Sequence, residues 1–186
     1  MMASNTSIVL RLIQKAAANQ KTAARGMPGK KALQKSVYLF NLEHGYFNFK
    51  WADYGPFSAE VQQIAHDLAY CGKINIREIP TKKEGAVIQS MQYVKDFGTL
   101  ENFPSDMDAT LERIVGFIEG RKPRELELLA SVHYLAQRQL QQAGTYDTES
   151  VHQLLSKLKP SAGFTLGDVG EALQALKAGG FSLDLE

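Results

Sequence analysis

Lys30-Lys-Ala-Leu-Gln-Lys-Ser-Val-Tyr-Leu-Phe40 and Tyr54-Gly-Pro-Phe-Ser58 are the two stretches that decide the fold of this chain. Apolar residues in the first stretch recur at helical spacing, which predicts a helix over 30–43 that ends at Gly45. Its buried stripe is expected to consist of Ala32, Leu33, Val37 and Phe40. The side chains expected on its outward face are those of Lys31, Gln34, Lys35 and Asn41.

The second stretch predicts a turn that leads into another helix. Pro56 has a fixed φ and pushes Gly55 out of the helical region, so the chain bends there. The Ser58 hydroxyl is placed to cap a helix over 59–71. Tyr54 is interpreted as an aromatic anchor, and all four named residues therefore have structural reasons for their positions.

The flanking segments complete a recognisable order of elements. Apolar spacing predicts a first helix over 6–19, and alternating aromatic and polar residues predict a short strand over 46–51. Two alternating runs joined by a basic turn predict a β-hairpin over 73–94. Helix, helix, helix and hairpin follow one another in the order of a small winged-helix unit.

The second half of the sequence is dominated by helical patterns. Glycine, asparagine and proline in 97–105 indicate a linker, and the helices expected after it begin near Asp106 and cover 125–142, 149–158 and 165–178. We therefore predict a mainly α fold with a small β-hairpin, of the α+β class. It would comprise a winged-helix-like domain over 1–97 and a helical C-terminal region over 105–186 packed on it.

Composition is that of an ordinary globular protein. Of the 186 residues, 44% are hydrophobic and 22% charged, which argues against a disordered chain. No apolar run approaches the roughly 20 residues that cross a bilayer, so no membrane association is expected. Cys71 is the only cysteine, which excludes an internal disulfide and favours a cytoplasmic location.

Charge is distributed unevenly although the net charge is only +1. Eight basic residues and one acidic residue lie within 1–50, which indicates a surface that could face a polyanion. The third predicted helix offers only Gln62 and Gln63 for reading bases, so binding would depend on phosphate contacts. The alternative is a solvated lysine face. The candidate nucleic-acid-binding residues are Lys30, Lys31, Lys35, Lys82 and Lys83.

The sequence contains no recognisable catalytic pattern. Its four histidines are scattered and none is paired at i, i+4, so no metal site is expected. Cys71 lies near a helix C-terminus, where the helix dipole disfavours the thiolate. The glycines show neither a phosphate-loop nor a dinucleotide-binding spacing. We therefore expect no catalytic residues, no cofactor and no enzyme activity.

Three motifs together carry a family resemblance. Leu33-Gln-Lys-Ser-Val-Tyr-Leu39, Gly45-Tyr-Phe47 and Tyr54-Gly-Pro-Phe-Ser58 precede a helix that ends at Gly72. This arrangement resembles the bacterial YwgA-like proteins, which are described as predicted helix-turn-helix regulators, and more loosely the Panacea domain of SocA-type antitoxins. The resemblance covers about residues 8–95. It implies a winged-helix-type fold without catalytic residues and activity through partner binding.

Two functions remain open at this point. The first is a non-catalytic bacterial or phage regulator of winged-helix type that binds DNA through its lysines and acts in transcriptional regulation. The second is a protein-interaction module, such as an antitoxin or adaptor that neutralises a partner protein. Exposed helical faces also favour a homodimer.

Overall fold

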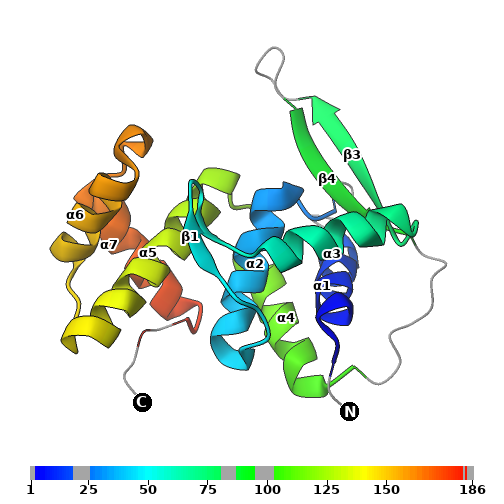
Figure 1. The fold of residues 1–186 in the computed structure, drawn as a ribbon, viewed down its shortest axis with the longest axis horizontal. Coiled ribbons are helices and arrows are strands. Elements are labelled where there is room, and N and C mark those ends of the chain that lie inside the picture. The colour runs from blue at the N-terminus through cyan, green and yellow to red at the C-terminus, as the bar shows by residue number, and fades with distance from the viewer. Residues whose placement is uncertain (1–2, 19–25, 81–86, 95–102, 182, 184–186) are drawn as a thin grey trace.

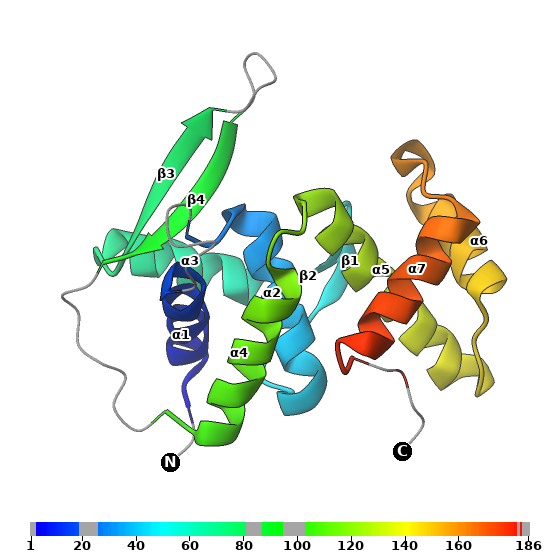
Figure 2. The same cartoon turned by 180° about the vertical axis from the view of Figure 1, so that it is seen from behind.

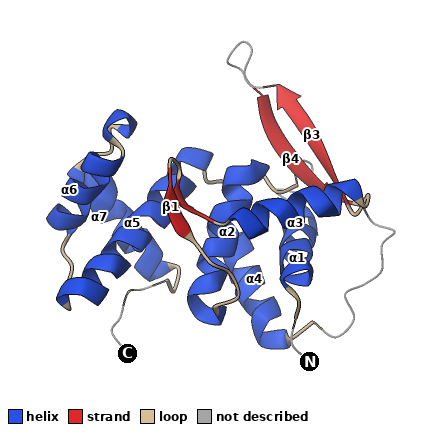
Figure 3. Ribbon diagram, in the orientation of Figure 1, coloured by secondary structure: helices blue, strands red, loops and turns tan. Residues whose placement is uncertain are grey.

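A computed structural model describes residues 3–18, 26–80, 87–94, 103–181 and 183. Within these residues the chain is mainly helical, with two small antiparallel β-hairpins, which confirms the predicted α+β class (Figure 3). The elements are α1 (Asn5–Ala18), α2 (Gly29–His44), β1 (Lys50–Ala52), β2 (Gly55–Phe57), α3 (Ala59–Tyr70), β3 (Ile74–Pro80), β4 (Val87–Tyr93), α4 (Ser105–Ile118), α5 (Pro123–Ala143), α6 (Thr148–Leu158), a 3₁₀ turn (Pro160–Ala162) and α7 (Leu166–Ala178).

The first three helices form where the apolar spacing predicted them, and the predicted caps are present. The backbone N–H of Val61 donates to the Ser58 hydroxyl at 3.5 Å at the start of α3. Gly45 ends α2 in the left-handed conformation with φ 66°, which favours glycine. Local capping chemistry thus determines where these helices begin and end.

The α2 helix is buried on every side rather than along one stripe. Every residue from Ala32 to Phe40 is buried, because α1, α3, α4, α5 and β2 all pack against this helix. The expectation that Gln34 and Lys35 face outward is therefore wrong. A helix surrounded by neighbours must bury polar side chains as well, and these need hydrogen-bond partners.

The segment after α2 differs from its prediction. The strand expected over 46–51 is shorter and begins at Lys50, and 55–57, expected to be a turn, is its antiparallel partner, with Trp51 opposite Pro56. The reason lies in Asn41, whose side-chain amide donates to the Phe47 carbonyl at 2.8 Å and accepts from the Phe47 N–H at 2.5 Å. The backbone of Phe47 is thus paired with a side chain and not with a strand.

The hairpin predicted over 73–94 is confirmed as β3 and β4, which pair from Ile74 with Tyr93 to Pro80 with Val87. This ribbon projects from the body of the molecule (Figure 1). Its base is fixed by Met27, which lies just before α2 and exchanges two backbone hydrogen bonds of 2.9 Å with Met91 of β4. The tip, with the candidate residues Lys82 and Lys83, lies outside the described residues.

The C-terminal helices continue the same core. The α4 helix packs against α1 and α2, and α5 packs against α2, while α6 and α7 pack on α5 at the end of the molecule opposite the ribbon (Figure 2). A buried hydrogen bond of 2.9 Å joins the Tyr38 hydroxyl of α2 to Nδ1 of His133 in α5. In the described part of the chain, no helix has the length and apolar character that a membrane span requires.

Gln34 gives the first prediction, because its amide is the buried partner of the α3 cap residue. Its Nε2 donates to the Ser58 carbonyl at 2.8 Å, and its Oε1 accepts from the Ser58 N–H at 3.0 Å. We expect Gln34→Leu to lower the free energy of unfolding by about 2 to 3 kcal/mol, because it leaves the buried N–H without a partner.

The matched control is Gln63→Leu, on the exposed face of α3. Urea unfolding followed by the fluorescence of Trp51, the one tryptophan, should show a change within about 0.5 kcal/mol for this variant. Equal effects of the two substitutions would contradict the assigned role of Gln34.

Candidate functional site

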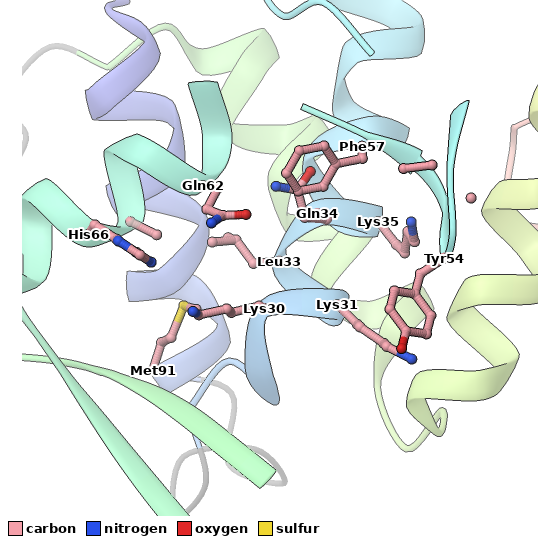
Figure 4. A pocket seen from close by; sticks show the side chains of 13 residues that line it. Lys30, Lys31, Leu33, Gln34, Lys35, Tyr54, Phe57, Gln62, His66 and Met91 are labelled. Atoms are coloured by element: carbon pink, nitrogen blue, oxygen red, sulfur yellow. The ribbon is translucent and has the colours of Figure 1, made fainter. Parts of the chain in front are cut away.

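An apolar groove opens between the N-terminal half of α2, α3 and the β1–β2 hairpin. It has a volume of about 290 Å³, and its walls are largely apolar. Figure 4 shows its lining side chains converging from α2, α3, β2 and β4. The side chains that form the walls of this apolar groove are Leu33, Ala52, Phe57, Gln62, Ala65 and Met91.

The edge of the apolar groove is cationic. Lys30 and Lys31, at the start of α2, supply its positive charge, and exposed His66 of α3 also lines the groove. The groove thus combines apolar walls with a few polar and charged groups, a pattern typical of ligand-binding pockets.

Lys35 lies at the hairpin end of the apolar groove but is only 3% exposed. Its Nζ donates to the Pro56 carbonyl at 2.7 Å and so fastens the hairpin to α2. Burial, reinforced by the nearby charges of Lys159 and Lys31, lowers the pKa of Lys35 to about 7. The interpretation of Lys35 as a phosphate contact is therefore wrong, because a side chain inside the fold cannot reach a DNA backbone.

Lys31 and Lys159 share one carboxylate. Lys159 Nζ donates to Glu127 Oε1 at 2.5 Å, and Lys31 Nζ donates to Glu127 Oε2 at 3.3 Å. Burial alone would raise the pKa of Glu127, but the hydrogen bond and charge of Lys159, together with Lys31, lower it below its usual range. Burial lowers the pKa of Lys159, and Glu127 offsets this only in part. With Lys35, these residues form a lysine cluster that has more cations than anions.

Tyr54 separates the apolar groove from a second depression. Its ring is 56% exposed, and Lys31 Nζ lies 3.5 Å from the ring centroid. Beyond this pair lies a cationic hollow of about 790 Å³, next to the start of α5. Its charged lining side chains are Lys31, Lys122, Arg124 and Lys159, together with Asp53 and Glu127.

Close packing and hydrogen bonds explain why the other predicted turn residues occupy their positions. Gly55 has φ 84°, and a Cβ at this position would lie 2.4 Å from the Ser131 hydroxyl. That hydroxyl is buried and has no hydrogen-bond partner. Pro56 supplies the carbonyl that binds Lys35, and Ser58 caps α3. Of these four residues, Tyr54 and Gly55 line the apolar groove, while Pro56 and Ser58 hold the hairpin and α3 in place.

The outer face of α3 is poorly suited to reading DNA. It exposes Glu60 and Asp67 beside Gln62 and Gln63, and its sequence contains neither lysine nor arginine. Carboxylates on a helix repel the phosphates that line the major groove. Among the candidate lysines that the structure describes, Lys30 is exposed, Lys31 is half-exposed and paired with Glu127, and Lys35 is buried.

The described residues contain no group of three or more histidine, cysteine, aspartate or glutamate side chains that could hold a metal ion. Burial lowers the pKa of His133 to about 4 and raises that of its partner Tyr38, so both rings are neutral at pH 7. Their hydrogen bond therefore joins α2 to α5 as a contact between two neutral rings. Cys71 lies exposed at the end of α3.

Sequence reasoning missed three residues of this region, namely Met91, Glu127 and Lys159. Glu127 sits between two leucines on α5, and Lys159 precedes the proline that ends α6. Neither position shows a pattern that relates it to α2. Only the packing of α5 on α2 brings their side chains to Lys31.

Lys35 gives a prediction about pH. Its pKa is near 7 in the folded chain and about 10.4 in an unfolded one, so between these values the unfolded state binds the extra proton. The destabilisation caused by burying Lys35 is therefore complete below pH 7 and declines as the pH rises towards 10.4. Lys35→Met also removes the hydrogen bond to Pro56, at a cost that does not depend on pH. We therefore expect the free energy of unfolding of Lys35→Met, relative to that of the unmodified protein, to be higher at pH 6 than at pH 9.5, as measured by urea unfolding.

If the free energies of unfolding of Lys35→Met and of the unmodified protein differed by the same amount at both pH values, the result would contradict the lowered pKa of Lys35. Lys157→Met is the matched control, because Lys157 is exposed on α6. Its effect on the free energy of unfolding should be small and should not change over this range of pH.

Comparison with known protein families and with curated proteins finds no match to the chain. The resemblance to YwgA-like proteins and to the Panacea domain therefore stays a prediction. The function has to be inferred from the two features that the fold builds side by side, the apolar groove and the lysine cluster.

Proposed function

We propose that this protein is a non-catalytic binding module that accepts an apolar segment of a partner protein in the apolar groove. The observation that carries this proposal is the pairing of apolar walls from α2, α3, β4 and the β1–β2 hairpin with lysine side chains at the edge. A recessed apolar surface of this kind accommodates the few side chains that dominate binding energy in protein interfaces. The occupant is an apolar peptide segment of the partner.

Rigidity of the groove supports this proposal. Its α2 wall is buried on the side away from the groove, and its hairpin wall is held by Lys35. A groove that is already formed loses little conformational entropy when a segment binds, so more of the contact energy appears as affinity. Its α3 wall begins at the cap residue Ser58, whose backbone N–H and carbonyl are both hydrogen-bonded to the side-chain amide of Gln34.

The role would be that of an adaptor or an antitoxin-like regulator, which acts by occupying its partner. Exposed Cys71, the chain's one cysteine, suits a reducing compartment, and we place this activity in the cytoplasm. No catalytic step is part of the proposal.

A steric block tests the apolar groove. Gln62 lines it from an exposed position on α3, so Gln62→Trp should fill it without disturbing the core. Peptides would be selected from a displayed random library with the full chain, and their affinity measured by fluorescence anisotropy. We expect Gln62→Trp to weaken their binding at least about tenfold, or about 1.4 kcal/mol.

Gln63→Trp is the matched control, because Gln63 is the neighbouring exposed residue on α3 and does not line the apolar groove. It should leave peptide affinity unchanged. Equal losses in the two variants, or selected peptides that Gln62→Trp does not affect, would argue against the groove as the binding site.

DNA binding is the second candidate function, and the projecting β3–β4 ribbon favours it (Figure 1). The ribbon exposes Arg77, and its turn carries Lys82 and Lys83 in the sequence. Basic residues on a projecting ribbon can contact phosphates without reading bases. In this candidate function the ribbon acts in the manner of a wing, and the acidic face of α3 stays away from the duplex.

A salt titration tests this second function. If the ribbon binds DNA, the affinity for a 20-base-pair duplex should fall steeply between 50 and 200 mM salt, because bound phosphates release counterions. Lys82→Glu combined with Lys83→Glu should weaken binding and reduce the salt slope by about 2.

The control for charge is Arg138→Glu combined with Lys157→Glu, at exposed positions of α5 and α6. This double variant changes the net charge by the same amount as Lys82→Glu combined with Lys83→Glu. It should leave the dependence of DNA affinity on salt concentration unchanged. No binding to the duplex at 50 mM salt would rule out the DNA function.

A further inference from the structure

The cationic hollow adjoins the apolar groove, and the two share Lys31 and Tyr54. It lies between the tip of the β1–β2 hairpin, the start of α5 and the segment that follows α6. A chain segment bound in the apolar groove that continues past Tyr54 would therefore enter the cationic hollow directly.

Of the two carboxylates that line the cationic hollow, Asp53 and Glu127, the second is already neutralised. Glu127 accepts hydrogen bonds from Lys31 and Lys159, and its side chain is only 12% exposed. Lys122 and Arg124, in contrast, are exposed at the start of α5, where the helix dipole also favours an anion. The surface that a ligand would meet here is therefore positive.

Arg124 is held in place before any ligand binds. Its guanidinium carbon lies 4.6 Å from the centroid of the Phe164 ring, and its Nη2 donates to the Ala162 carbonyl. An arginine that is stacked and hydrogen-bonded in this way keeps further N–H groups for a carboxylate and loses less side-chain entropy when it binds one.

We infer that the cationic hollow binds acidic side chains of the same partner segment whose apolar part lies in the apolar groove. This inference rests on the proposed function, and it specifies the partner as an apolar stretch followed by aspartate or glutamate. The acidic residues contact Lys122 and Arg124, and the chain of the partner crosses the pair formed by Lys31 and Tyr54.

Two observations favour an acidic peptide over a nucleic acid. The exposed carboxylate of Asp53 lines the cationic hollow, and it would repel a continuous phosphate backbone more than isolated carboxylates that can bind away from it. The apolar walls of the adjoining groove, which include Phe57 and Met91, offer a phosphate backbone no partner. A peptide with apolar and acidic parts matches both surfaces at once.

The test uses peptides selected with the full chain and compares Lys122→Glu/Arg124→Glu with the charge control Arg138→Glu/Lys157→Glu. We expect the selected peptides to carry acidic residues beside an apolar run. Lys122→Glu/Arg124→Glu should lower the affinity for these peptides at least about tenfold, while the charge control should bind them as tightly as the unmodified protein does. Replacing the acidic residues of the peptide by Asn or Gln should cost a similar factor in the unmodified protein and little in Lys122→Glu/Arg124→Glu.

Other outcomes separate this inference from the proposed function. One such outcome is a set of selected apolar peptides without enrichment in acidic residues, whose binding is lost in Gln62→Trp but unchanged in Lys122→Glu/Arg124→Glu. That outcome would overturn the inference and leave the proposed function standing. Peptides that Gln62→Trp does not affect would overturn the proposed function itself. If Lys122→Glu/Arg124→Glu lost binding of a 20-base-pair duplex or of inorganic phosphate while acidic peptides still bound, the inference would also be overturned.

Discussion

The hydrogen bond from Lys35 to the Pro56 carbonyl, made inside the fold, is the interaction on which the candidate site depends. It joins the central helix to the β1–β2 hairpin and so fixes the position of Tyr54. Tyr54 in turn holds Lys31 over its ring and separates the apolar groove from the cationic hollow. One buried ammonium group thus determines the geometry of both surfaces.

This arrangement is costly for stability. Three lysines lie around one glutamate, and burial lowers the pKa of both Lys35 and Lys159 because the charged form loses water. A buried ion pair rarely stabilises a protein more than apolar residues of similar volume would. The cluster therefore adds little to stability beyond what apolar residues would, and it lies beside the open apolar groove.

Part of this site could be predicted from the sequence. Ser58 caps α3 as its hydroxyl predicted, but 55–57 is a strand and not a turn, and nothing in the sequence indicated that Tyr54 and Gly55 line a groove. Lys35 was assigned to the wrong side of α2, because a lysine is normally exposed and periodicity cannot reveal that a helix has neighbours on all sides. Glu127 and Lys159 were missed, since ion pairs between distant segments leave no local pattern.

The sequence by itself determined the elements with local causes: the helices with their apolar spacing, their serine, threonine and glycine caps, and the β3–β4 ribbon with its alternation. Tertiary structure alone decided which charges are buried, which are paired and which face solvent. The physical reason is the distance along the chain over which each interaction acts. Backbone propensity and capping act within a few residues, whereas desolvation and ion pairing depend on segments that meet only when α5 packs on α2.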